Sequence, residues 1–256
     1  MRIATWNVNS VRAREQHVRA WLVRQQPDLL MLQETKCEAA QFPDFSDLGY
    51  RAETVGQKSY NGVAVLGRIP FETTERALPG RPWDDNQSRY IEVEAAGATF
   101  ANLYLPNGNS GGEDGYQYKL NWMDALRERA RALLDARRDC AFLGDYNCCP
   151  TAEDFASGTL RPDDALVRPE TRSRYRSLLW LGLTDAARAL QPSGPAYTFW
   201  DYQAGAWRRN AGLRIDFALL SPVLAERLLA AVPDRAERTE PQPSDHVPLV
   251  VDLADA

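Results

Sequence analysis

Short apolar runs alternate along this chain with longer stretches in which apolar residues recur at every third or fourth position. The short runs predict strands at 2–6, 29–32, 62–66, 89–95, 98–105, 141–143, 197–202, 213–220 and 247–253. The longer stretches predict helices at 10–26, 116–138, 171–181 and 224–231. We expect Ser10 to cap the first helix and Pro27 to end it.

Strands outnumber helices, and the segments 89–95 and 98–105 flank Gly97 as the arms of an antiparallel hairpin would. A mixture of hairpins and crossovers favours an α/β fold with one mixed sheet, or two sheets with helices outside, over a purely parallel Rossmann sheet. No repeat, low-complexity segment or linker rich in Gly, Ser or Pro divides the 256 residues. We therefore expect one domain that spans residues 1–256.

The composition is that of an ordinary globular protein, with 44% hydrophobic and 25% charged residues. The chain begins without a long apolar segment, and no apolar run approaches the roughly 20 residues of a membrane span. No CxxC pair occurs, so we expect reduced thiols, and together with the absence of an export signal these predict a cytoplasmic protein. We also expect a monomer. The cysteines are Cys37, Cys140, Cys148 and Cys149.

The net charge of −5 and the pI of about 5.2 argue against non-specific binding to nucleic acid. The stretch 161–214 departs from this average, because it holds nine arginines against five acidic residues. Only three of the thirty basic residues are lysine, at positions 36, 58 and 119. The arginine-rich stretch is either a bias of genome composition or a strip that faces phosphates.

Polar residues follow the predicted strands repeatedly, at the ends where loops of α/β proteins converge on ligands. A single acid at such a place is usually a turn residue, but six such places are harder to explain in that way. Asp216 is the sharpest case, because a carboxylate inside the apolar run LRIDFALL is costly to bury unless it is paired. The residues concerned are Asn7, Asn9, Glu34, Tyr104, Asp145, Asn147, Asp216, Asp245 and His246.

This set lacks the thiol or histidine pairs of a soft-metal site, whereas carboxylate and amide oxygens suit Mg²⁺ or Mn²⁺. Glu34, helped by Asp245 or Asn9, is enough for an ion that keeps several waters. The chain has no GxxxxGK[ST] loop, no GxGxxG fingerprint and no GxSxG elbow. The residues alone therefore predict metal-assisted hydrolysis of a phosphate ester, without naming DNA.

Eight segments occur in the order and approximate spacing of a known family, and they span most of the chain. They are WNVNS, LQETK, YNGVAVL, NLYLPNG, GDYN, YTFWDY, LRIDFALLS and SDHVPL. Together they resemble the exonuclease III and abasic-site endonuclease family of the DNase I-like superfamily. The resemblance implies a four-layered α/β/β/α sandwich with two mixed sheets face to face. It also implies Mg²⁺-dependent cleavage of duplex DNA, either 5′ of abasic sites or from 3′ ends.

The same resemblance implies roles for individual residues. Asp145 would orient and deprotonate the attacking water, while His246 would stabilise the pentacoordinate phosphate and be oriented by Asp216. Asp216 beside His246 favours the imidazolium, which is the better partner for an oxyanion. The implied contacts with the phosphate are Tyr104, Asn107 and Asn147. The implied metal site has Glu34 as principal ligand, with Asn7, Asn9, Asp145, Asn147, Asp245 and His246 lining or completing it.

For the substrate, the resemblance implies a small apolar pocket that admits a flipped, baseless deoxyribose and excludes a base. Its residues are Phe199, Leu213 and Ile215, which the residues alone would equally allow as simple core positions. Two further groups are expected along the DNA backbone. They are Lys58, Tyr60 and Asn61 in one loop, and Arg172, Arg174 and Arg176 in the arginine-rich stretch.

The loop SGGEDGYQY departs from the family pattern, because it is acidic and Gly-rich where some relatives are basic. This leaves open the balance between exonuclease and abasic-site activity. Two alternatives share the catalytic residues or the fold: a phosphatase or phosphodiesterase of inositol lipids or sphingomyelin, and a non-catalytic DNA-binding relative. LQETK and YLPNG favour a DNA enzyme over the first, and the complete set of carboxylates favours an enzyme over the second.

Overall fold

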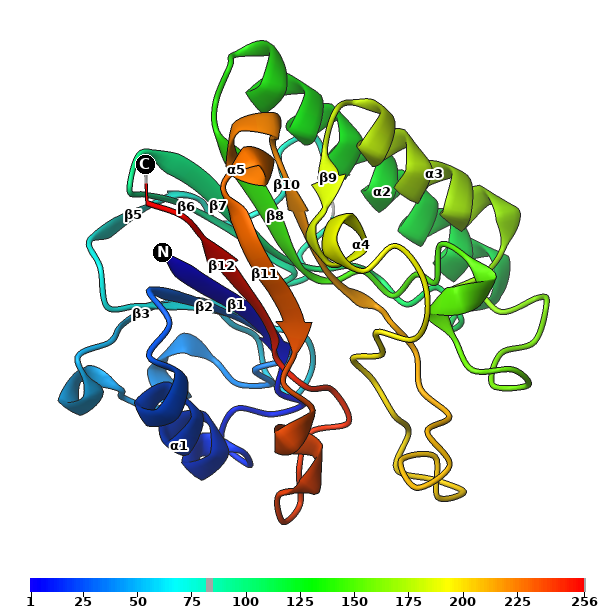
Figure 1. Ribbon diagram of the computed structural model, residues 1–256, viewed down its shortest axis with the longest axis horizontal. Coiled ribbons are helices and arrows are strands. Elements are labelled where there is room, and N and C mark those ends of the chain that lie inside the picture. The colour runs from blue at the N-terminus through cyan, green and yellow to red at the C-terminus, as the bar shows by residue number, and fades with distance from the viewer. Residues whose placement is uncertain (82–84, 256) are drawn as a thin grey trace.

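The computed structural model describes residues 1–81 and 85–255, which form two six-stranded mixed sheets (Figure 1). The first sheet has the order β11-β12-β1-β2-β4-β3, and the second has the order β5-β6-β7-β8-β10-β9. The first comprises β1 (Arg2–Asn7), β2 (Leu29–Gln33), β3 (Arg51–Val55), β4 (Val63–Gly67), β11 (Leu228–Pro233) and β12 (Leu249–Leu253). The second comprises β5 (Phe71–Glu75), β6 (Tyr90–Ala95), β7 (Ala98–Tyr104), β8 (Cys140–Asp145), β9 (Thr184–Asp185) and β10 (Asp216–Leu220).

Both sheets share one pattern of strand directions. Each has a parallel pair at its centre, β1 with β2 and β7 with β8, and antiparallel neighbours on either side. The carboxyl ends of parallel neighbours meet at the same edge of a sheet. Each sheet therefore gathers the residues that follow its two central strands at one edge.

Three apolar layers separate the sheets and helices, as strand alternation requires. The first lies between the sheets and contains Ile3, Met31 and Leu143. The second packs Phe142 of the second sheet against residues of α2 and α3. The third packs Trp6 of the first sheet against residues of α1. The predicted four-layered α/β/β/α sandwich is confirmed. The helices are α1 (Glu15–Gln25), α2 (Gly112–Asp135), α3 (Pro169–Trp180), α4 (Ala186–Leu190) and α5 (Pro222–Glu226).

A buried polar contact joins the two sheets across the central apolar layer. The Asn102 side chain on β7 donates to the carbonyl oxygens of Leu32 (2.9 Å) and Ala64 (2.8 Å) in the first sheet. The same side chain accepts a 2.7 Å hydrogen bond from Gln33 Nε2, and neither Gln33 nor Asn102 is exposed. These directional bonds fix how one sheet sits on the other, which apolar packing alone specifies less tightly.

Several boundaries differ from those that the sequence predicts. The first helix begins at Glu15 rather than Ser10, because Ser10 has φ of 87° and its N–H donates to the carbonyl oxygen of Glu34. The segment 197–202 is not a ladder strand; within it, Phe199 makes isolated bridges with Leu213 and His246. The segment 224–231 is not one helix, because pairing with β12 makes 228–233 a strand.

The predictions also omitted three short strands, β3, β5 and β9, all of which lie at or beside a sheet edge. All four cysteines are buried thiols. Across 1–81 and 85–255, no helix is both long enough and apolar enough to cross a membrane.

Candidate active site

A hollow of about 310 Å³ opens where the central strand pairs of the two sheets end. Asn7 ends β1 and Glu34 follows β2, while Tyr104 ends β7 and Asp145 ends β8. The stacking of the two parallel pairs thus brings four of the predicted residues to one place. Its lining residues are Glu34, Tyr104, Asn107, Asn109, Asp145, Asn147, Leu160, Asp164, Leu166, Phe199, Asp201, Leu213, Ile215, Asp245 and His246.

The buried side chain of Asn7 links carboxylates of the two sheets. Its Nδ2 donates to Glu34 Oε1 at 2.9 Å and to Asp145 Oδ2 at 3.0 Å. Glu34 Oε2 also pairs with Lys36 Nζ at 2.7 Å. Burial would raise the pKa of Glu34, but Lys36 and the Asn7 amide outweigh it and hold that pKa below its usual value. Glu34 is therefore a carboxylate at neutral pH.

Beside this pair, His246 contacts two buried acids. Its Nδ1 lies 2.8 Å from Asp216 Oδ2, and its Nε2 lies 3.8 Å from Asp145 Oδ2. Burial would lower the pKa of His246, yet the carboxylate of Asp216 raises it, so the imidazolium is favoured. Burial raises the pKa of Asp145, while His246 and the N–H groups of Asn147 and Asn7 oppose that rise.

The amides of Asn107 and Asn147 form a second link, between the loop after β7 and the end of β8. Asn107 Nδ2 donates to Asn147 Oδ1 at 2.9 Å, and Asn147 Nδ2 donates to the carbonyl oxygen of Leu105 at 2.9 Å. Burial, together with Glu34 and Asp145, raises the pKa of Tyr104. The Tyr104 phenol therefore keeps its proton at physiological pH.

The backbone around these residues is strained. Glu34, Asn147, Asn9 and Lys36 all have positive φ, at 52°, 44°, 44° and 53°. Such conformations cost about 1–3 kcal/mol each outside glycine and are held only where the surroundings demand them. Two of these residues, Glu34 and Asn147, line the hollow.

The oxygen donors of the site fit a hard cation. Two carboxylates, Glu34 and Asp145, bond the same Asn7 amide, and the donor set includes no thiol. Asp145, Asp216 and His246 also place potential ligand atoms within 4.8 Å of one another. We favour the Glu34–Asp145 side, because His246 Nδ1 is already engaged by Asp216. The remaining predicted ligands, Asn9 and Asp245, bond each other at 3.1 Å.

The three predicted pocket residues converge. Phe199, Leu213 and Ile215 belong to one apolar cluster with Leu160, and all four line the same hollow as Asp145. The Phe199 ring lies edge-on to the His246 ring, with centroids 5.0 Å apart. These side chains therefore form one recess beside Asp145, Asn147 and His246, and its role as a sugar pocket stays a prediction.

The residues predicted to follow the DNA backbone have varied surroundings. Lys58 is exposed, as is Tyr60 at 72% of its surface, whereas Asn61 is buried and its amide donates to Gln57 and Gln87. Of the three predicted arginines on α3, Arg176 is exposed. Its neighbours are engaged, because Arg172 donates to the carbonyl oxygen of Cys149 and Arg174 pairs with Asp124.

Sequence reasoning overlooked the buried Lys119 on α2. Its Nζ donates to the carbonyl oxygens of Asn107 (2.9 Å) and Asn147 (2.5 Å), and burial lowers its pKa to about 8. The scarcity of lysine was the available clue, since Lys36 also lies at the site.

It also overlooked a group of buried charges behind the recess, which we call the arginine cluster. Arg214 donates to Asp154 and to Asp185, both at 2.7 Å, and Arg188 donates to Asp154 at 2.7 Å. Arg214 stands between Leu213 and Ile215, so its placement inside an apolar run was the signal that could have revealed it.

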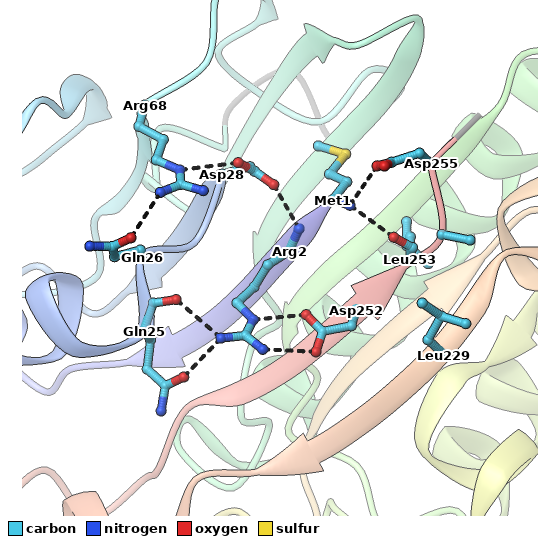
Figure 2. A pocket seen from close by; sticks show the side chains of 11 residues that line it. Met1, Arg2, Gln25, Gln26, Asp28, Arg68, Leu229, Asp252, Leu253 and Asp255 are labelled. Atoms are coloured by element: carbon cyan, nitrogen blue, oxygen red, sulfur yellow. Dashed lines mark hydrogen bonds and ion pairs between the residues drawn. The ribbon is translucent and has the colours of Figure 1, made fainter.

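A larger hollow, of about 620 Å³, lies at the opposite ends of the strands, where β1 begins (Figure 2). Its charged groups are paired with one another: Arg2 bonds Asp252, and Arg68 bonds Asp28. The N-terminal amine lies beside Asp255. The smaller hollow instead gathers Glu34, Asp145 and His246, and it also opens onto the apolar side chains of Phe199, Leu213 and Ile215, so we take that one as the candidate active site.

Comparison with known proteins shows the family of the chain. Residues 4–246 match the endonuclease/exonuclease/phosphatase family. The chain is 32% identical to exodeoxyribonuclease III of Haemophilus influenzae, over 97% of this chain and 98% of that protein. A 3′-5′ exonuclease (NExo) from Neisseria meningitidis superposes with a TM-score of 0.95 at 35% identity, with each chain fully covered. An AP endonuclease from Archaeoglobus fulgidus superposes with a TM-score of 0.92 at 35% identity, with 99% of each chain covered.

Proposed function

Because this chain belongs to the endonuclease/exonuclease/phosphatase family, we propose that it is a metal-dependent DNA-repair phosphodiesterase. It cleaves duplex DNA 5′ of abasic sites, removes nucleotides from 3′ ends, or does both. One observation carries the proposal. The Asn7 amide joins Glu34 to Asp145 directly beside the Asp216–His246 pair, and this polar group opens onto an apolar recess.

Asp145 is the group that orients and deprotonates the attacking water. Burial raises its pKa toward the range in which a carboxylate is an effective base. The imidazolium of His246 stabilises the charge that develops on the phosphate. Its Nε2 is available for this role, because it lies 3.8 Å from Asp145 Oδ2 and both residues line the hollow. Asp216 holds the ring through Nδ1 and keeps it protonated.

The phosphate is held by neutral donors. Asn107 and Asn147 supply amide groups that their mutual hydrogen bond keeps in place. Tyr104 supplies a hydroxyl that remains protonated, because burial and then the neighbouring carboxylates raise its pKa. Donors that are fixed before the reaction require little rearrangement when charge develops.

Glu34 and Asp145 would hold a Mg²⁺ ion, for which Mn²⁺ would substitute, and Asn7 would orient both carboxylates. Asn9 and Asp245 complete the rim of this site. When bound, the ion would neutralise phosphate charge and assist departure of the leaving oxygen. Asn147 and His246 serve the phosphate rather than the ion, because Asn147 Oδ1 already accepts from Asn107 and His246 Nδ1 is already bonded to Asp216.

The recess formed by Phe199, Leu213 and Ile215 accepts the sugar of a flipped abasic nucleotide. Selection for a missing base follows, because extrusion costs least where pairing is already lost. The duplex itself is held by its phosphates, for which exposed Lys58 and Arg176 are available. We further propose that the protein acts as a monomer in the cytoplasm, with its four thiols reduced.

Two duplexes test the function, one with an internal abasic analogue and one with a recessed 3′ end. With Mg²⁺, we expect incision on the 5′ side of the analogue, shortening of the 3′ end, or both, and no reaction in EDTA. Full activity in EDTA would contradict the metal-dependent mechanism. Hydrolysis of inositol phosphates or sphingomyelin without DNA cleavage would favour the lipid-directed alternative. DNA binding without cleavage would favour the non-catalytic one.

A further inference from the structure

Lys119 lies under the site, on the face of α2 that meets the ends of β7 and β8. None of its surface is exposed, and its ammonium contacts two backbone carbonyl oxygens, those of Asn107 and Asn147. In the described part of the chain it is the sole hydrogen-bond donor to either carbonyl. It therefore ties together the two segments whose side-chain amides face the hollow.

The ammonium forms no ion pair with any described residue, although charge without a partner is expensive to bury. An apolar side chain of similar length would avoid that cost. Most other basic positions in the chain are arginine, whose planar fork needs more room than an ammonium at the end of a straight stem. An apolar side chain would also leave both carbonyl oxygens without a donor among the described residues, so the lysine is explained by the two hydrogen bonds that one compact ammonium supplies at this place.

The neighbouring loop is shaped to admit this side chain. Gly108 has φ of 86°, and a Cβ atom added there would come within 2.7 Å of Lys119 Cδ. On the other side, Asn147 has a positive φ of 44°, and its carbonyl oxygen accepts a hydrogen bond from the ammonium. Both segments thus depart from ordinary backbone geometry where they meet Lys119.

We propose that Lys119 is a positioning residue for the hydrolysis reaction: its ammonium fixes the spacing of Asn107 and Asn147, and thereby the two amides that hold the scissile phosphate. The proposal rests on the DNA-cleaving function proposed above. Lys119 does not touch the substrate. Its contribution reaches the phosphate through the asparagines, whose side chains already bond each other.

The test combines Lys119→Met with Asn147→Ala in a double-mutant cycle on the abasic duplex. Lys119→Met keeps the length of the stem and removes the charge and both hydrogen bonds. We expect kcat to fall about 10- to 100-fold, because a misplacement of about 1 Å is costly in a preorganised site. KM should change little. The double variant should be no slower than Asn147→Ala alone, since residues that act as one unit are not additive.

Arg129→Met is the matched control on the same helix. Arg129 bonds the buried Glu92, so its loss removes a buried polar contact far along α2 from Asn147. It should lower thermal stability while leaving kcat unchanged. If Lys119→Met keeps parental kcat, or if its effect multiplies with that of Asn147→Ala, the proposal is wrong.

If Lys119→Met fails to fold, Lys119→Gln replaces it in the double-mutant cycle with Asn147→Ala. The glutamine is neutral but retains one amide group that can donate hydrogen bonds. The proposed function is tested separately, since its failure would leave the parental protein itself inactive on DNA.

Discussion

The protein contains two groups of buried acids, one in the arginine cluster and one in the active site, and they differ in how fully their oxygens are paired. In the arginine cluster, all four carboxylate oxygens of Asp154 and Asp185 accept hydrogen bonds, several from guanidinium groups. In the active site, Asp216 Oδ1 is buried and accepts none from the described residues. The pKa of Asp154 is held below its usual value despite burial, because of Arg214, whereas burial raises the pKa of Asp145.

The difference separates acids that support the fold from acids that are available for chemistry. A carboxylate whose oxygens face guanidinium groups is stable as an anion and has no capacity left for a ligand. The acids of the active site are bonded mainly by neutral amides and by one imidazolium, so they can still bind a cation or a proton. Arg214 and Asp216 are only two residues apart, yet they belong to different groups, because intervening backbone directs them to opposite sides.

The largest effect should come from Asp145→Asn. This change keeps the shape of the side chain but removes the base, so single-turnover cleavage of abasic DNA should slow by about 10³-fold. The free energy of unfolding, measured in urea, should stay the same or rise, because a buried carboxylate becomes a neutral amide. Cleavage near the parental rate would contradict the role of Asp145 as the base.

Asp154→Asn should have the converse effect. It leaves Arg214 buried without a full partner, and breaking a buried pair in this way costs about 3–5 kcal/mol of unfolding free energy. Urea unfolding measures the loss. Turnover per folded molecule should remain parental, and a large fall in kcat with unchanged stability would show that the two groups are not separate.

The pH dependence of stability should sharpen the same contrast. The folded-state pKa of Asp154 is depressed, so its stabilising contribution is complete above its unfolded pKa of about 3.9. That contribution disappears as pH falls through the lower, folded-state pKa. The difference in unfolding free energy between the parental protein and Asp154→Asn should therefore shrink below about pH 4. A difference that stays constant to pH 2 would contradict this explanation.

The smallest effect should come from Phe199→Ala. This substitution enlarges the apolar recess and changes neither group of acids. An enlarged recess excludes a base less well, so the preference for abasic over intact nucleotides should fall about tenfold. The ratio of kcat/KM values on matched duplexes measures it. Leu213→Ala should act in the same direction, and undiminished selectivity in both would separate the recess from substrate choice.

Much of this architecture could be predicted from sequence, for a physical reason. Strands with continuous apolar runs, such as 29–32 and 141–143, were identifiable because both of their faces are buried. Polar residues directly after them were therefore conspicuous, which is how Glu34 and Asp145 emerged.

The features that were missed depend on partners distant in the chain. The segment 224–231 was predicted to be a helix, and only pairing with β12 makes 228–233 a strand. Lys119 looks like one more polar residue on an amphipathic helix until the ends of β7 and β8 close over it. Asn102 sits in an apolar run, where nothing in its neighbourhood indicates the carbonyl groups of the opposite sheet.

The polar contact of Asn102 with Gln33 has a consequence for how the enzyme loses activity in denaturant. Because the active site draws Asn7 and Glu34 from one sheet and Asp145 from the other, it exists only while the sheets keep their mutual alignment. Asn102 and Gln33 secure that alignment from the centre of the molecule, among the last groups that solvent reaches. Loss of activity and loss of tertiary structure should therefore coincide in one cooperative transition, with no inactive but folded state preceding it.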